Sequence, residues 1–258
     1  MSRGFSGLWR HPDFLKLWVG ETVSQFGSLV GGTALQFAAI LVLGASPLQI
    51  ALLVVASRLP SFLAGLFAGV WVDRLRRRSI LIAADCGRAL CLATIPAAAL
   101  LGILRIEQLY AVAFLTGILT TFFDVAYQSY LPTLVERDDL VEGNSKLATT
   151  AAIAEISGFG IAGWLVQIIT APFAILVDAA SFLVSAVAVW LIRAPEPPES
   201  RSPENNNFLL EAREGLRVVA RNPYLRAMAV TTFILEFSFQ IIGAVITVFG
   251  LRELGFSP

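Results

Sequence analysis

Long apolar stretches follow one another along the chain, separated by short polar breaks. They cover roughly residues 17–43, 47–71, 79–104, 107–131, 147–170, 172–193 and 227–250. Each matches the ~20 residues that a helix needs to cross the hydrocarbon core of a bilayer. Strands of soluble proteins are shorter, and buried soluble helices rarely follow one another in such a series without a polar face. The pattern therefore predicts seven membrane-spanning helices.

The polar breaks contain residues that begin and end helices. Pro47 and Pro172 fall at predicted helix starts, where the missing N–H of proline does least harm. One polar segment is long: residues 194–222 begin rich in Pro, Glu, Ser and Asn and become amphipathic near Leu209. We expect a linker that ends as a short helix on the membrane surface. The predicted parts are a six-helix bundle (1–193), the linker (194–222) and a further helix (223–258).

The composition supports a membrane protein and gives little support to other classes. Hydrophobic residues make up 56% of the chain and charged residues 15%, against roughly 45–50% and 25% in soluble domains. Lys+Arg and Asp+Glu balance at 19 each, so charge indicates no nucleic-acid partner. Cys86 and Cys91 point to different helix faces, so neither a disulfide nor a metal site is predicted. No catalytic constellation emerges, and we expect neither an enzyme nor a bound cofactor.

The basic residues indicate an orientation. The first sixteen residues carry charges and no cleavage site, which is typical of a retained cytosolic segment and not of a signal peptide. If each stretch then crosses once, only Arg105 and Arg252 fall on the outer side, a strong positive-inside bias. The residues on the inner side are Arg3, Arg10, Lys16, Arg74, Arg76, Arg77, Arg78, Arg137, Lys146, Arg193, Arg201, Arg213, Arg217 and Arg221, with Arg226 at the edge.

One loop concentrates charge between two apolar stretches, since residues 69–78 read GVWVDRLRRR. The loop resembles a motif of the major facilitator superfamily of secondary transporters, carried here by Gly69, Asp73, Arg74, Arg77 and Arg78. Arg76 is a departure, because many members have glycine there. Residues 13–28, 124–147 and 177–186 are similar to the efflux branch, which includes macrolide-efflux and enterobactin-exporter-like proteins.

The resemblance implies an all-α membrane fold of two six-helix bundles, each of inverted three-helix repeats, with substrate bound between them near the midplane. This chain would supply the N-terminal bundle, the linker and one helix of the second bundle. We therefore expect a truncated or incompletely read twelve-helix transporter, or one whose second bundle is another polypeptide.

In the family, the loop motif acts as a latch that holds one face closed during part of the cycle. By resemblance, Gly69 would allow close packing, Asp73 would face a helix N-terminus, and Arg74, Arg77 and Arg78 would pair with carboxylates. The alternative is a simple positive-inside anchor. For Arg76 and Arg78 that alternative is at least as well supported.

Ionisable residues inside apolar stretches are costly in lipid and should face protein or water. They are Glu21, Arg58, Asp85, Arg88, Asp124, Glu155, Asp178 and Glu236. Polar residues recur at helical spacing on the first, fourth and seventh stretches, and the resemblance implies that these helices line the central cavity. The stripes are Glu21, Gln25, Ser28, Gly32 and Gln36; Gly117, Thr121, Asp124 and Gln128; and Thr232, Glu236, Gln240, Gly243 and Thr247. Polar packing between helices is the alternative.

Asp124 is the first candidate for proton coupling or for binding a substrate cation, followed by Glu21 and Glu236. Gln25, Gln128 and Gln240 share their cavity faces. Arg58 lies in mid-stretch and must be paired, and Glu21, Asp124 and Glu155 are its candidate partners.

The remaining candidates have supporting roles. Asp85 and Arg88, one turn apart near the cytosolic end of the third stretch, form a predicted local pair that supports the latch. Asp178 lies near the external end of its helix and is interpreted as structural. Glu155 could belong to either group. His11 is expected to have no specific role.

Residues 158–163, GFGIAG, match a dinucleotide-binding pattern, with Asp178 about twenty residues beyond the first glycine. An Ala-rich helical stretch precedes them where that fold needs a strand, so we interpret these small residues as a helix-packing site. The leading hypothesis is a proton-coupled exporter of small amphipathic molecules, of drug or siderophore type, in a bacterial inner membrane. Its partners would be lipid, substrate, protons and the missing bundle. The alternative is a non-transporting half-transporter or membrane scaffold.

Overall fold

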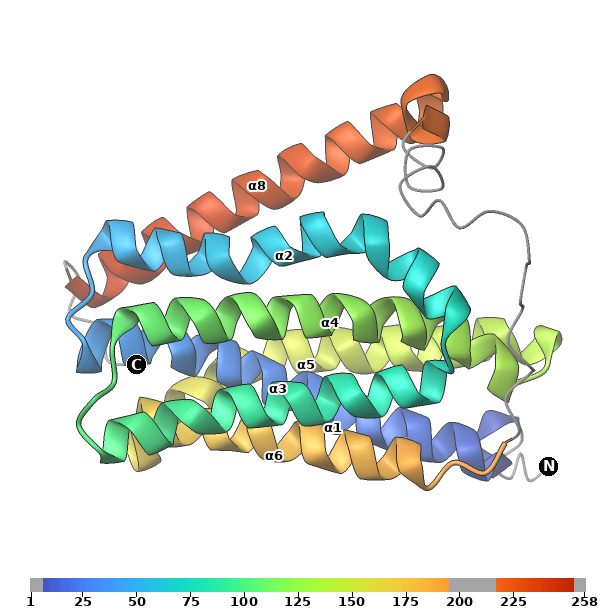
Figure 1. Ribbon diagram of the computed structural model, residues 1–258, viewed down its shortest axis with the longest axis horizontal. Coiled ribbons are helices and arrows are strands. Elements are labelled where there is room, and N and C mark those ends of the chain that lie inside the picture. The colour runs from blue at the N-terminus through green and yellow to red at the C-terminus, as the bar shows by residue number, and fades with distance from the viewer. Residues whose placement is uncertain (1–6, 195–216, 253–258) are drawn as a thin grey trace, which may run out of the picture.

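The computed structural model describes residues 7–194 and 217–252, and these residues form helices without a strand. Inside the helices, the side chains of Asp73, Arg74, Glu236 and Gln240 lie outside the description. The long helices are α1 (Pro12–Phe37), α2 (Pro47–Arg74), α3 (Arg77–Leu100), α4 (Ile106–Leu134), α5 (Leu140–Ile169), α6 (Ala171–Trp190) and α8 (Pro223–Arg252) (Figure 1). All seven predicted stretches contain a helix among the described residues.

Local sequence explains most of the helix ends. Ser46 and Gln49 form a capping box at the start of α2, which satisfies amides that the helix itself leaves free. α1 begins at Pro12, earlier than predicted, because Nδ1 of His11 accepts a hydrogen bond from the amide of Phe14 (3.1 Å). His11 is therefore the N-cap of α1, and the expectation that it has no specific role was wrong.

Several described helices are long and apolar enough to cross a membrane. Four meet this criterion as single spans: Pro12–Val42, Arg77–Leu100, Ile106–Leu134 and Ala171–Trp190. The first of them continues α1 through a π-helical segment, η2 (Ala38–Val42). α5 makes a fifth if its two parts, which meet at 49° between Gly158 and Gly160, count as one span. The chain is a multi-pass membrane protein.

The first six helices pack in a pattern with internal symmetry (Figure 1). α1 lies against α5 and α6, α4 lies against α2 and α3, and α3 lies against α6. Exchanging α1–α3 with α4–α6 maps these contacts onto one another. This is the arrangement expected of two three-helix repeats, and it agrees with the fold that the sequence resemblance implied.

α8 contacts α2 and lies on its outer side (Figure 1). Its described side chains are exposed, including Phe233, Phe237 and Ile242. Residues 217–221 before it are helical, and the rest of the predicted linker lies outside the described residues.

The apolar core of the six helices falls into two clusters. One contains Phe14, Leu17, Tyr130 and Val189, near the bundle end that carries the N-terminus. The other contains Val30, Leu53, Ile95 and Ile175, toward the opposite end. Charged and hydroxyl side chains lie between the clusters, so the bundle has a polar layer at middle depth.

Candidate functional site

Six polar side chains from four helices define what we call the polar layer. They lie about 12 to 20 Å along their helices from the end of the bundle that carries the N-terminus, at 1.5 Å per residue. The residues of the polar layer are Glu21 and Gln25 on α1, Asp85 and Arg88 on α3, Asp124 on α4 and Asp178 on α6. Similar depth on neighbouring helices brings these side chains together.

Arg88 is the centre of the layer. Its side chain is only 4% exposed and forms a salt bridge with Asp85, whose side chain is 0% exposed. The guanidinium carbon lies 4.3 Å from the ring centre of Phe123 on α4 and 4.0 Å from that of Phe182 on α6. Rings on both sides of a desolvated guanidinium stabilise its charge through their π faces. The predicted pair with Asp85 is confirmed, but it lies in the middle of α3 and not near a helix end.

The charge of Arg88 also acts on other carboxylates. It interacts electrostatically with Glu21, Asp124 and Asp178. The sequence named Glu21, Asp124 and Glu155 as candidate partners of Arg58, whereas the described arginine whose charge acts on Glu21 and Asp124 is Arg88 on α3. An apolar run predicts the depth of a charge in the membrane but not the helix that it faces, which explains the difference.

Hydrogen-bond acceptors gather where α1 faces α4. Oε1 of Glu21 accepts a hydrogen bond from the Gln25 side-chain amide (2.8 Å). Oε2 of Glu21, Oε1 of Gln25 and the hydroxyl of Tyr127 are buried without a hydrogen-bond partner among the described residues. Asp124 and Gln128 are exposed on α4, and the Asp124 and Glu21 carboxylates interact electrostatically. We call Glu21, Gln25, Asp124 and Tyr127 the α1–α4 site.

The α1–α4 site suits a proton or a ligand that donates hydrogen bonds. Buried acceptors without partners are costly to leave unsatisfied, and two neighbouring carboxylates favour positive charge between them. The sequence predicted Glu21, Gln25 and Asp124 as cavity residues, and the structure brings these three together. It places Glu155 on an exposed face of α5. Tyr127 was missed, although it follows Asp124 by one helical turn.

Asp178 is buried between helices, with 5% of the residue exposed. It is the eighth residue of α6 and lies about 10 Å inside the helix end that begins at Ala171. Its Oδ1 lies 3.4 Å from the hydroxyls of Ser28 on α1 and Ser181 on α6. The sequence placed Asp178 near the end of its helix, but the residue belongs to the polar layer.

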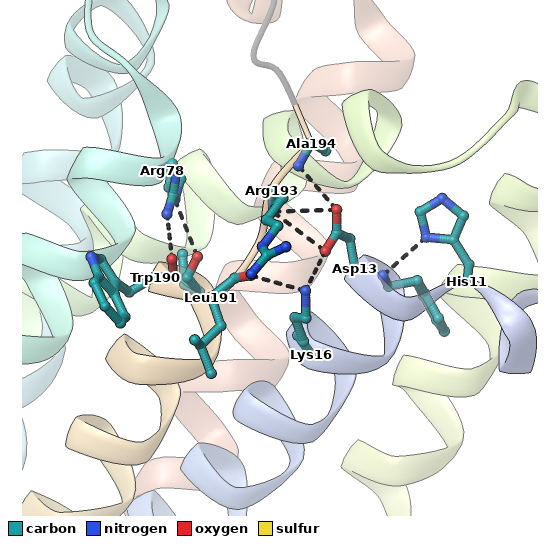
Figure 2. Close-up of polar contacts among 10 residues, drawn as sticks. His11, Asp13, Lys16, Arg78, Trp190, Leu191, Arg193 and Ala194 are labelled. Carbon is teal, nitrogen blue, oxygen red and sulfur yellow. Dashed lines mark hydrogen bonds and ion pairs between the residues drawn. The ribbon is translucent and has the colours of Figure 1, made fainter.

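A second group of polar contacts holds the end of α6, and we call it the α6 clasp (Figure 2). Oδ2 of Asp13 accepts hydrogen bonds from the amides of Arg193 (3.3 Å) and Ala194 (3.0 Å). Lys16 donates to the Leu191 carbonyl (2.9 Å) and also contacts Asp13 (2.7 Å).

Arg78 completes the clasp from α3. It donates to the carbonyls of Val189, at 3.2 Å, and Trp190 (Figure 2). The last carbonyls of a helix have no partner within it and carry partial negative charge, so two cations at this end stabilise α6. These bonds go to backbone carbonyls, and the carboxylate pairing predicted for Arg78 stays a prediction. The roles of Asp13 and Lys16 were missed, although their i,i+3 spacing was visible.

The remaining loop-motif residues differ in how far their side chains are described and in how deeply they are buried. Asp73 and Arg74, the centre of the predicted latch, have side chains outside the described part. Arg76 is exposed and Arg77 is half-buried. In the part of the chain that the structure describes, a Cβ added at Gly69 would meet no atom within 4 Å. The close packing expected at Gly69 is not seen among the described residues and stays a prediction.

The glycine-rich segment at residues 158–163 lies within α5, as the helix-packing interpretation predicted. A Cβ added at Gly158 would come within 2.8 Å of Leu29 on α1, so this glycine allows the two helices to approach. Among the described residues, no group of three or more His, Cys, Asp or Glu side chains could hold a metal ion.

Comparisons with known proteins agree with this architecture. The family model described as transmembrane secretion effector, of the major facilitator superfamily, matches residues 4–254. Macrolide efflux protein A of Streptococcus pyogenes is 25% identical over 248 residues, which are 95% of this chain and 60% of that protein. The multidrug efflux pump Tap of Mycolicibacterium fortuitum is 30% identical over 200 residues, 73% of this chain and 48% of the pump.

A further relative is the MFS-type transporter YfiS of Bacillus subtilis, which is described as uncharacterized. It is 24% identical over 233 residues, 88% of this chain and 54% of the transporter. The chain therefore spans about half the length of the curated relatives it matches. Since the family model covers nearly all of the chain, and the helices repeat in two sets of three, the chain belongs to the transmembrane secretion effector family of the major facilitator superfamily.

Proposed function

We propose that this chain is part of a proton-coupled exporter of small amphipathic molecules, which works by alternating access in a bacterial inner membrane. The N-terminus lies in the cytosol, as the distribution of basic residues indicates. Residues 1–193 form one bundle, 194–222 the linker, and 223–258 the first helix of a second bundle. The α1–α4 site faces that second bundle and contributes half of the substrate cavity. Two efflux proteins among the relatives support the direction of transport.

The observation that carries the proposal is the unbalanced charge of the polar layer. One cation, Arg88, interacts there with four carboxylates, those of Glu21, Asp85, Asp124 and Asp178. Uncompensated charge at membrane depth is costly. Protons or a cationic group of a substrate compensate it, and a change of access from one side to the other would let them enter and leave.

Asp124 and Glu21 are the residues through which the site couples transport to protons. Asp124 is exposed on the face of α4, so water and substrate reach it directly. Oε2 of Glu21 accepts no hydrogen bond from a described residue, and the Glu21 carboxylate interacts electrostatically with the buried Tyr127 hydroxyl. A proton on either carboxylate removes one of two interacting negative charges and so changes what the site binds.

The test is ethidium efflux in everted membrane vesicles from bacteria that express this protein from its own locus. Asp124→Asn and Glu21→Gln each remove a charge at nearly constant volume, and we expect each to abolish efflux driven by a pH gradient. Asp138→Asn is the matched control, since Asp138 is exposed in the turn Arg137–Asp139, away from the polar layer. Undiminished efflux in both site variants would contradict the assigned coupling.

An intact-mass measurement of the native protein in its own membrane tests the second bundle. A mass near twice the 27.8 kDa of this chain would place that bundle on the same polypeptide. A mass of 27.8 kDa would require a partner chain, which co-purification from mild detergent would then identify. A homogeneous, partner-free protein of this mass would support the scaffold alternative.

A further inference from the structure

Asp178 is a deeply buried carboxylate that the α1–α4 site does not use. It lies on the side of α6 that packs against α1. Its described hydrogen-bond contacts are the hydroxyls of Ser28 and Ser181, each at 3.4 Å from Oδ1. The Ser181 hydroxyl also makes a shorter bond of 2.8 Å to the backbone carbonyl of Asp178, so it is only partly available to the carboxylate.

α1 is shaped to accept this carboxyl group. A Cβ added at Gly31 would lie 2.1 Å from Oδ2 of Asp178, and one at Gly27 would lie 1.9 Å from Oγ of Ser181. Only glycine leaves room there, so the carboxyl of Asp178 occupies a fitted recess in the neighbouring helix. A side chain that lipid or solvent could surround would not need this recess.

The charged groups around Asp178 leave its own charge weakly compensated. Arg88 on α3 interacts with it electrostatically, but the salt bridge of Arg88 goes to Asp85. Arg88 also interacts with three other carboxylates of the polar layer, which are those of Asp85 on α3, Glu21 on α1 and Asp124 on α4. The negative charge of Asp85 also acts on Asp178. Among the described residues, Asp178 has no cation within salt-bridge distance.

We propose that Asp178 is a second proton-binding residue of this transporter, placed behind the α1–α4 site at the contact of α1 with α6. This inference rests on the proposed function for its role in coupling. A proton from water binds a carboxylate oxygen of Asp178 and leaves again as the carboxylate reforms. The protonated group donates a hydrogen bond to the Ser28 hydroxyl, whereas the ionised group only accepts one. Proton binding therefore changes the polar contact between α1 and α6, and α1 carries Glu21 and Gln25 of the α1–α4 site.

Infrared difference spectra between acid and alkaline pH test this directly on the purified protein in lipid nanodiscs. The carbonyl stretch of a protonated carboxylic acid is separate from the ionised carboxylate bands. We expect the wild type to gain such a band on acidification and Asp178→Asn to lose one component of it. Asp138→Asn, the exposed control, keeps that component. A band that is unchanged by Asp178→Asn overturns the proposal, as does a wild type without any band.

A second variant covers the case in which Asp178→Asn does not fold. Ser28→Ala removes the hydroxyl that lies 3.4 Å from Oδ1 of Asp178, and the frequency of a carboxylic acid carbonyl follows its hydrogen bonding. We expect the component to remain in Ser28→Ala but to shift, and an unshifted band would contradict the proposed contact. The infrared measurement does not depend on transport activity. Loss of the component in a protein that does not move ethidium would support the proton site and refute the proposed function.

Discussion

Asp13 and Ala194 are separated by 181 residues, yet Oδ2 of Asp13 accepts a hydrogen bond of 3.0 Å from the backbone amide of Ala194. The first turn of α1 thereby fixes the point at which the chain leaves α6 (Figure 2). Lys16 and Arg78 hold the last carbonyls of the same helix. The α6 clasp therefore ties three helices together at one end of the bundle.

Replacing Asp13 with Ala should loosen the chain after α6. The variant loses the acceptor for the amides of Arg193 and Ala194, at a cost of about 1 kcal/mol for charge-assisted bonds at a partly exposed site. A local opening that is about fivefold more populated exposes the bond after Arg193 to trypsin. Cleavage at Arg193, followed by mass spectrometry, should accelerate by that factor. Equal rates in the wild type and the variant would mean that Asp13 does not hold this segment.

Alanine substitutions at Arg78 and at Arg76 should differ in their effect on the stability of the protein, although each removes one positive charge from the same loop. Arg78→Ala removes two bonds to the carbonyls of Val189 and Trp190, and we expect a loss of about 1 kcal/mol. Arg76 is exposed, so Arg76→Ala should stay within about 0.5 kcal/mol of the wild type. Thermal unfolding in detergent, monitored by circular dichroism, measures both. Equal effects would indicate that only the loop's total charge matters.

Gly31 and Gly32 are adjacent in α1, but a side chain would fit only at position 32. A Cβ at Gly31 would clash with Asp178 at 2.1 Å, whereas a Cβ at Gly32 would meet nothing within 4 Å. Gly31→Ala should destabilise the protein by about 1–3 kcal/mol. Gly32→Ala should be neutral, or stabilising by up to about 1 kcal/mol from helix propensity. The same unfolding assay compares the two variants, and a stable Gly31→Ala protein would show that α1 and α6 are less closely packed than described.

Arg88 and Asp85 should be strongly coupled energetically. Arg88→Gln leaves the fully buried Asp85 without its salt-bridge partner, and such a loss costs about 3–5 kcal/mol. Adding Asp85→Asn should recover part of that loss, because the stranded charge is gone. A double-mutant cycle on unfolding free energies measures the coupling, and additive effects would contradict a direct pair.

The sequence was sufficient to predict the helices and their order. A bilayer requires an apolar segment of a certain length, and that length can be read from the sequence. Ser46 and Pro47 mark the start of α2 through a cap and a helix-start residue, neither of which needs a tertiary contact. The pair of Asp85 and Arg88 was also predictable, since both residues lie on one helix face. These features depend on residues close together in the chain.

The contacts between distant helices were not predictable from one sequence. Helical spacing identified a polar stripe on α1, but nothing in that pattern tells which helix faces it. Gly31 in particular is required only because Asp178 of α6 lies opposite. For the same reason Glu21 was named as a candidate partner of Arg58, whereas the arginine whose charge acts on it is Arg88.

The packing of α1 against α6 also has a consequence for biosynthesis. A ribosome that adds about 5–20 residues per second needs roughly 8 to 30 s to pass from Glu21 to Asp178. During that time α1 is already made while α6, the helix that covers Gly27 and Gly31, is not. Newly made α1 must therefore wait at the insertion machinery or in the bilayer with these two glycines uncovered. Assembly of the bundle is completed only when the sixth helix arrives and the ends of α1 and α6 are joined.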